Sequence, residues 1–283
     1  MAGTLITRIN SYYDSLSKSD QAISDFLTQN IDTAARLSIQ ELALATNVST
    51  ATISRFAKKI GFASFQDLKL AIHITEPVNT DNFFSELAPS DSYKDILKKN
   101  FTSNISSLNA TFNLVSEQDL EQTLEILLNA DTVGFFGLGG SNAIAGIAFH
   151  KFLRMPLKTV YHQDFHYQQM LAAKLTAKDC AFVISHTGKN KDTLRIVEIL
   201  KSRSVPVIAI TSFANSLLAK AADVALISIS EEISFRPEAV ASTVSQISLL
   251  DAIFLMYGMK TQVETEDTIK NIRQIIKESR VNN

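Results

Sequence analysis

The sequence lacks the features that would tie it to an oxidising compartment or to a membrane. Among 283 residues there is a single cysteine, Cys180, so no disulfide can form within the chain. The start, MAGTLITRINSYYDSL, has no apolar core of the signal-peptide type, and no apolar run reaches the roughly 18 residues that a membrane helix needs. Even ISLLDAIFLMYGM is interrupted by Asp251. We therefore expect a cytoplasmic chain without membrane segments, in which Cys180 is a small buried hydrophobe rather than a nucleophile.

The sequence also lacks an excess of either charge. Its formal net charge is -2, with 46% hydrophobic and 20% charged residues, which is typical of a globular protein long enough for two domains. This balance argues against attraction of nucleic acid by bulk charge, but a groove-reading module needs only a local basic patch. Between Arg36 and Lys59 there are four cations and one anion, Glu41. We find no internal repeat or low-complexity segment.

The segment SIQELALATNVSTATISRFAKKIG, from Ser38 to Gly61, has the spacing of a helix-turn-helix. Ser38 and Glu41 form a capping box, so one helix begins at Ser38. Asn47 is suited to a left-handed conformation and ends that helix. Ser49 caps a second helix, whose apolar residues recur at i, i+3, i+4 and i+7 and predict one buried stripe: Ile53, Phe56, Ala57 and Ile60.

The opposite face of the second helix is small, hydroxylated and cationic. At roughly 100° per residue, it is centred on Ala51, Arg55 and Lys58. Such a face suits a DNA major groove, with short residues allowing close approach, Arg55 bridging a guanine edge and lysines meeting phosphates. The alternative is an ordinary helical hairpin with a solvated charged face. The predicted DNA-binding residues are Ser38, Ser49, Thr50, Ala51, Thr52, Ser54, Arg55, Lys58 and Lys59.

Further amphipathic helices surround this segment and complete an all-α first domain. A first helix is marked by Leu5, Ile9, Tyr12, Tyr13 and Leu16. A second helix is predicted to start with Ser19 or Asp20 as its cap, and Ser64 with Asp67 opens another that runs to about Ile74. We predict a helical domain over 1–76 and a linker over 77–92, which contains Pro77 and Pro89.

Within residues 93–283 the pattern is at first helical, up to Ala130. After this residue, strand-like runs alternate with helical patterns. Five strand-like runs are predicted at Thr132–Phe136, Lys158–His162, Cys180–Ser185, Val205–Thr211 and Asp223–Ser230. Helical patterns separate the first four, and only a short connection precedes the last. This alternation predicts a five-stranded parallel sheet flanked by helices, in the flavodoxin-like order 2-1-3-4-5. Ala239–Met259 and Thr265–Lys277 are predicted to be closing helices.

Two polar loops follow the first and third strands, which are neighbours in this order. The first is GLGGS, ending at Ser141, and the second is SHTGKN, ending at Asn190. Both open helices at the same edge of the sheet, and helix N-termini with hydroxyl groups suit a phosphate monoester. A dinucleotide fingerprint is less well matched, because Asn142 occupies the third glycine position. Two ordinary strand-helix turns are the other alternative.

Both regions resemble one family, the MurR/RpiR bacterial transcription regulators. LSIQELA, VSTATISRFAKKIGF and SFQDLK are similar to its helix-turn-helix domain, and GLGGS, SHTGKNKDT and IAITSFANSLLAKAADVAL to its sugar isomerase (SIS) domain. The resemblance implies DNA binding through Thr50 to Lys59 and a phosphosugar effector. This sequence departs from the family pattern at three positions, which are Asn190 (usually threonine), Lys189 (commonly acidic) and Thr243 (usually arginine). The implied effector-binding residues are Gly139, Ser141, Ser185, His186, Thr187, Gly188 and Asn190.

From these observations we predict a ligand-responsive transcription factor that controls genes for sugar or amino-sugar catabolism. One helix-turn-helix contacts a half-site, so we expect a homodimer or higher homo-oligomer on a palindromic double-stranded operator. The alternative is a phosphosugar isomerase with an accessory helical domain. Its candidate bases would be His162, His166, Glu231 and Glu238. We assign no catalytic residue, no metal ligand and no cofactor.

Overall fold

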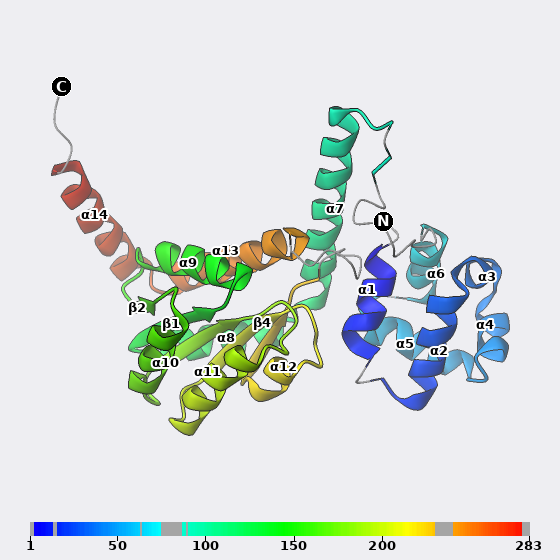
Figure 1. Cartoon of the computed structure of the whole chain (residues 1–283), viewed down its shortest axis with the longest axis horizontal. Coiled ribbons are helices and arrows are strands. Elements are labelled where there is room, and N and C mark those ends of the chain that lie inside the picture. Colours follow the sequence, from blue (N-terminus) through cyan, green and yellow to red (C-terminus); the bar gives the residue numbers. More distant parts are fainter. Residues whose placement is uncertain are drawn as a thin grey trace. The chain divides into compact units, whose positions relative to one another are not determined.

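A computed structural model describes residues 3–13, 16–62, 64–74, 87–88, 90–229 and 240–278 (Figure 1). Most of the predicted linker and the residues Glu231 and Glu238 lie outside these ranges. The chain divides into two compact units. The first comprises Met1–Leu114, Ser212–Asn215 and Ile227–Ser245, and the second comprises the rest. Within the described ranges, no helix combines the length and the apolar character that crossing a membrane would require.

Six helices with a shared apolar core form the N-terminal bundle. The side chains of Ile23, Ile53 and Phe56 are fully buried in this core, which confirms the predicted inner stripe of the second helix of the helix-turn-helix. The helices are α1 (Gly3–Tyr12), α2 (Lys18–Gln29), α3 (Ile31–Arg36), α4 (Ile39–Ala45), α5 (Thr50–Lys59) and α6 (Phe65–Ile74).

The turn between α4 and α5 is built as the sequence predicts. The Ser38 hydroxyl accepts a hydrogen bond from the Glu41 N–H, and the Glu41 carboxylate accepts one from the Ser38 N–H at 2.7 Å. Asn47 has a φ of 51°, and its position just after α4 lets the Val48 N–H reach the Ala43 carbonyl at 2.9 Å. This is a Schellman-type end, which turns the chain sharply into the next helix.

The end of α5 repeats this device with a glycine. Gly61 has a φ of +87°, its N–H donates to the Lys58 carbonyl, and the Phe62 N–H donates to the Ala57 carbonyl at 2.9 Å. Both helices of the pair are therefore closed by residues in the left-handed region, one asparagine and one glycine.

Three details of the bundle differ from the prediction. The cap of α2 is Ser17, whose hydroxyl accepts from the Asp20 N–H, rather than Ser19 or Asp20. The reason is that Asp20 sits at the third helical position and completes the capping box from inside the helix. The short helix α3 was not predicted, and α1 ends at Tyr12, before Leu16.

The C-terminal part of the chain contains the predicted five-stranded parallel sheet, in the order β2-β1-β3-β4-β5. The strands are β1 (Thr132–Gly137), β2 (Lys158–Tyr161), β3 (Cys180–Ile184), β4 (Val207–Thr211) and β5 (Val224–Ile227). A short helix precedes β5 where only a connection was predicted. The helices are α7 (Tyr93–Leu114), α8 (Glu117–Leu128), α9 (Gly140–Phe152), α10 (Phe165–Lys174), α11 (Lys191–Ser202), α12 (Leu217–Ala221), α13 (Val240–Lys260) and α14 (Gln262–Glu278).

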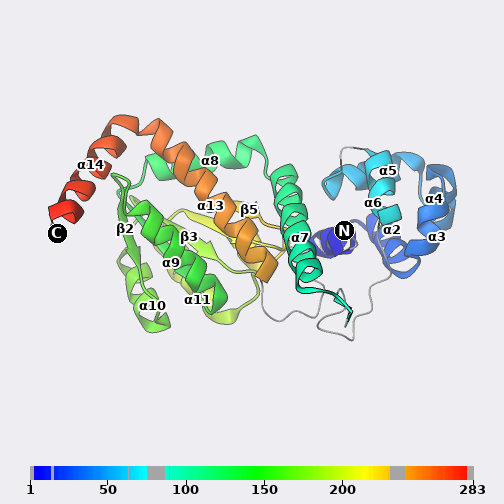
Figure 2. The ribbon, with the colours of Figure 1, turned by 90° about the horizontal axis from the view of Figure 1, so that it is seen from above.

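Side chains alternate between two cores, one on each face of this sheet. In β3, Cys180, Phe182 and Ile184 point into a core shared with α8, α9 and α13, whereas Ala181 and Val183 point into a core shared with α10, α11 and α12. Figure 2 shows α9 and α13 lying along the first face. Because both faces are covered, the central strands are continuously apolar, as is typical of parallel sheets.

We expect Asn47→Val to destabilise the N-terminal bundle by about 1–2 kcal/mol, because a β-branched residue is strained at a positive φ. Asn47→Gly is the matched control and should stay near the wild-type stability, since glycine adopts this conformation freely. Urea unfolding of the full chain, followed by far-UV circular dichroism, measures both variants. Equal stability of the two variants would show that the turn does not depend on this conformation.

Candidate functional site

The outward face of α5 is accessible to a partner. Ala51, Arg55 and Lys58 are all exposed, while the opposite stripe of the helix is buried. The cap hydroxyl of Ser49 lies 2.9 Å from that of Thr52, and Arg55 reaches the same Thr52 hydroxyl at 3.4 Å. The start of α5 therefore presents a set of hydroxyl groups beside a guanidinium group. This is the face that the sequence assigns to DNA.

Lys59 differs from the other predicted DNA-binding lysine. Its ammonium lies 3.0 Å from the carboxylate of Asp20 on α2, and the Asp20 side chain is only 10% exposed. Burial of this carboxyl raises its pKa, but the hydrogen bonds from Lys59 and Ser17 outweigh burial and bring the pKa below its usual value of 3.8. Lys59 thus ties α5 to α2, and its predicted contact with DNA stays a prediction.

Arg8 and Lys69 also hold the helix-turn-helix in place, and the sequence pattern did not single them out. The buried Arg8 donates to the Gly61 carbonyl at 3.1 Å, and its guanidinium lies 4.6 Å from the centre of the Phe62 ring. Lys69 on α6 donates to the Leu37 carbonyl just before α4. These side chains position the two ends of the motif from outside it.

The two predicted ligand loops leave the sheet side by side. In the register of the sheet Gly137, the last residue of β1, pairs with Ile184, the last residue of β3. The loops that begin at Leu138 and Ser185 therefore start from adjacent strand ends. The structure brings together both halves of the predicted effector site at this edge.

The first loop leaves the N-terminus of α9 open. Gly139 is the residue before the helix, has a φ of +56° and provides no side-chain cap, whereas α10 is capped by Asp164 and α11 by Asn190. A Cβ built on Gly139 or Gly140 would meet no atom within 4 Å. The Ser141 and Asn142 N–H groups donate to the Leu138 and Gly139 carbonyls, and the space beside the two glycines leaves room for an anion at the positive end of the helix.

A buried side-chain amide, that of Gln168, hydrogen-bonds to the end of β1, where this loop begins. Gln168 on α10 is fully buried, and it both accepts from the Gly137 N–H at 3.3 Å and donates to the Gly137 carbonyl at 2.9 Å. Asn142 also donates to that carbonyl and accepts a hydrogen bond of 2.7 Å from the Tyr161 hydroxyl. Asn142, which breaks the dinucleotide pattern, thus joins β1 to β2. Sequence reasoning missed Gln168, because its position on a weakly amphipathic helix gives no signal of a contact with β1.

The second loop is packed against the end of β4 and the start of α12. Gly188 has a φ of +61°, and a Cβ there would lie 2.3 Å from the Ser216 hydroxyl. The Leu218 N–H donates to the Gly188 carbonyl, and the Thr211 hydroxyl donates to the His186 carbonyl at 3.0 Å. Thr211 and Ser216 were not predicted as part of this site, although a polar residue at the end of a buried strand next to β3, as Thr211 is, was a usable signal.

The polar groups of the second loop retain hydrogen-bonding capacity. The Ser185 hydroxyl accepts from the Gly188 N–H at 3.2 Å and still has a proton to donate, and Thr187 is exposed. The Asn190 carbonyl oxygen caps α11 through the Thr193 N–H, which leaves its amide NH₂ as a donor. Burial lowers the pKa of His186, so its side chain is neutral at pH 7 and brings no charge to the loop.

The histidines considered as catalytic bases have structural roles or lie in solvent. The Nδ1 atom of His162 accepts from the Asp164 N–H at 3.0 Å, and its ring stacks on Tyr167 with centroids 4.2 Å apart. His166 is exposed at the start of α10. Cys180 is buried in β3, where burial raises the pKa of its thiol to about 12, so it carries no thiolate at neutral pH.

Fold and sites together define a class of protein: a helix-turn-helix with an exposed basic face joined to a doubly wound sheet that carries two polar loops at one edge. Comparison with known proteins agrees with both parts. The profile of the rpiR-family helix-turn-helix domain matches residues 3–76, and the profile of the SIS domain matches residues 126–256.

Relatives match over nearly the full length. An uncharacterised HTH-type transcriptional regulator of Caldanaerobacter subterraneus is 29% identical over 275 residues, which are 97% of this chain and 98% of that protein. The HTH-type transcriptional regulator HexR of Escherichia coli is 26% identical over 276 residues, 98% of this chain and 95% of HexR. The solved structure of Vibrio vulnificus NanR complexed with ManNAc-6P aligns with a TM-score of 0.63 at 22% identity, covering 98% of this chain and all of that chain.

The chain carries a helix-turn-helix domain of the rpiR family and an SIS domain, the two domains expected of an RpiR-type transcription regulator. The predicted family and fold are thereby confirmed. Its full-length relatives are named as transcription regulators, so it is a regulator rather than a phosphosugar isomerase.

We expect Lys59→Met to destabilise the bundle at neutral pH and to lose this effect in acid. The pKa of Asp20 is lowered in the folded state, so the pair stabilises the fold above pH 3.8 and ceases to do so as the pH falls through the folded pKa. Lys58→Met is the matched control, because Lys58 is exposed and forms no ion pair within the described residues. Urea unfolding at pH 7 and at about pH 3 compares the variants. A pH-independent difference between Lys59→Met and wild type would exclude the ion pair as its cause.

Proposed function

We propose that this regulator binds a phosphorylated sugar at the edge of its sheet and thereby changes its affinity for operator DNA. The observation that carries the proposal is the pairing of Gly137 with Ile184, which starts two ligand-type loops side by side. The open start of α9 and the hydroxyls of Ser185 and Thr187 supply the groups that a phosphate monoester needs. NanR, a structural neighbour, is complexed with the amino-sugar phosphate ManNAc-6P.

The effector-binding set remains the one predicted from the sequence, with Ser141 on the first loop and the other polar members on the second. We add Gln168 and Ser216 as residues that position the two loops without contacting the ligand. The proposed target genes are those for sugar or amino-sugar catabolism.

For DNA, we propose that α5 enters the major groove through the exposed face around Arg55. The proposed domain boundaries are 1–76 for the DNA-binding domain, 77–92 for the linker and 93–283 for the SIS domain. A single α5 reads one half-site, so a homodimer would match a palindromic operator. The exposed apolar side chains of α7 support self-association, because in an isolated protomer they would stay in contact with water. These side chains are Tyr93, Leu97, Phe101, Ile105 and Phe112.

Coupling requires the sugar phosphate to bind one arrangement of the dimer better than another. Titration of a labelled operator with the full chain, with and without a panel of sugar phosphates, tests this directly. A hit from the panel should shift the apparent Kd for DNA by roughly 5–150-fold. An affinity that stays constant across the whole panel would reject the coupling.

In the DNA-binding face, we expect Arg55→Ala to relax base preference at one operator position by about 1–3 kcal/mol, because a bidentate guanine contact is lost. Lys58→Ala should instead weaken all sequences alike and lower the salt dependence by about one charge. Fluorescence anisotropy with operator, single-base variants and random DNA, at several salt concentrations, separates these effects. If both variants bind the operator like wild type, the face is misassigned.

In the ligand loops, we expect Ser185→Ala combined with Thr187→Ala to abolish the effector response and to leave operator affinity unchanged. Ser202→Ala is the control, since it removes an exposed hydroxyl at the far end of α11. Effector binding is measured by the rise in melting temperature that a ligand specific for the native state causes. Loss of both effector and operator binding would indicate misfolding rather than a lost ligand contact.

A further inference from the structure

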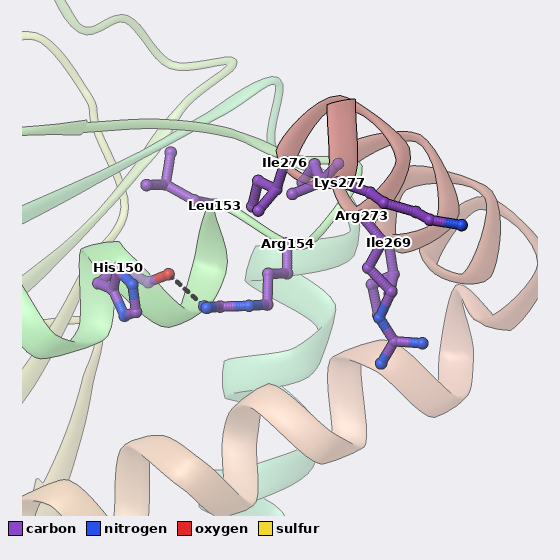
Figure 3. Close-up of a pocket in the computed structure, with 8 residues that line it drawn as sticks. His150, Leu153, Arg154, Ile269, Arg273, Ile276 and Lys277 are labelled. Carbon is purple, nitrogen blue, oxygen red and sulfur yellow. Dashed lines mark hydrogen bonds between the residues drawn. The ribbon is translucent and has the colours of Figure 1, made fainter. Parts of the chain in front are cut away.

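The last helix borders a groove that is not part of either proposed site. The groove has a volume of about 630 Å³ and lies between the end of α9 and the second half of α14 (Figure 3). Its lining combines aliphatic and basic side chains. The residues that line it are His150, Leu153, Arg154, Ile269, Ile272, Arg273, Ile276 and Lys277.

The apolar part of this lining has the spacing of a coiled-coil seam. Ile269, Ile272 and Ile276 follow Thr265 at intervals of four, three and four residues, which places all four on one stripe of α14. Thr265 is buried at the root of the helix, where its hydroxyl contacts the Met155 sulfur at 3.6 Å. Further along the helix Ile276 is 50% exposed. The stripe therefore begins in the core and continues, partly uncovered, along the groove.

The charges of α14 are separated along its length. Three acidic residues lie in its first two turns, at Glu264, Glu266 and Asp267, and three basic residues lie in its second half, at Lys270, Arg273 and Lys277, before the helix ends at Glu278. Lys270 is held by its own helix, 3.9 Å from Glu266 and 3.5 Å from Asp267. Arg273 and Lys277 form no ion pair with any residue that the structure describes.

We propose that α14 of a second copy of this chain occupies the groove in the antiparallel direction. An antiparallel partner brings its acidic half to the basic half of the first helix, and a two-fold axis makes the reverse contact identical. Glu266 and Arg273 are seven residues apart, so they lie on the same flank of the isoleucine stripe. In the pair, Glu266 therefore meets Arg273 of the partner subunit, once on each side of the axis.

This inference rests on the self-association in the proposed function and names one surface that supports it. An amphipathic anion would also match a basic and apolar lining, but it would leave the acidic half of α14 without a role. A second α14 matches the apolar stripe and both charged halves at once. The groove then holds side chains of the partner rather than solvent.

Charge reversal provides the experiment. Glu266→Arg places arginine opposite Arg273 at both symmetric contacts, and Arg273→Glu places two carboxylates there. Each variant of the full chain should self-associate at least about tenfold more weakly than wild type, as measured by sedimentation equilibrium. An equimolar mixture of the two variants should regain the wild-type mass, because each contact then pairs arginine with glutamate.

Lys178→Glu is the control, since it reverses an exposed charge on the loop before β3 and should leave the mass unchanged. If wild type associates but both variants keep its mass, or if the mixture is no heavier than its parts, the groove is not the contact and the inference is overturned. The effector-dependent shift in operator affinity, measured on the same variants, then still tests the proposed function separately. A wild-type chain that is monomeric at micromolar concentration overturns both the groove contact and the dimer, and an anionic ligand becomes the remaining occupant.

Discussion

The register between β1 and β3 is the constraint on which the SIS domain of this protein depends. Because side chains alternate between two separate cores, a shift of one residue would move Phe182 and its neighbours to the wrong face of the sheet. The same register makes Gly137 and Ile184 end their strands together. The burial of side chains on both faces of the sheet fixes the register, and the register in turn fixes where the two polar loops begin. Gln168 then fixes the direction in which the first loop departs.

The DNA-binding part depends on a different constraint, which is the angle between two short helices. Asn47 and Gly61, both with positive φ, set the chain direction before and after α5. Arg8 and the pair formed by Lys59 and Asp20 then attach α5 to the rest of the bundle. The outer face of α5 remains free for a partner because every one of these attachments uses the ends or the inner side of the helix.

Local signals in the sequence were sufficient for most elements of the fold. The capping box at Ser38, the left-handed Asn47 and the five strands depend on neighbouring residues, and the structure confirms them. Contacts between distant segments were not predictable in the same way. Gln168 reaches β1 over 31 residues and Lys59 reaches Asp20 over 39, so no periodicity within either segment reports them. The cap of α2 was placed wrongly because several adjacent polar residues compete for that position, and only the geometry of the capping box selects Ser17.

The state of the lone cysteine has a practical consequence for studying motion in this regulator. Its sulfur is enclosed in the centre of the sheet and holds its proton at neutral pH, so maleimide dyes and spin labels have little to react with in the folded chain. A cysteine introduced at any exposed position would therefore be modified alone. Distances between two labels introduced at exposed positions can then be followed as metabolites are added, with no native thiol to remove first.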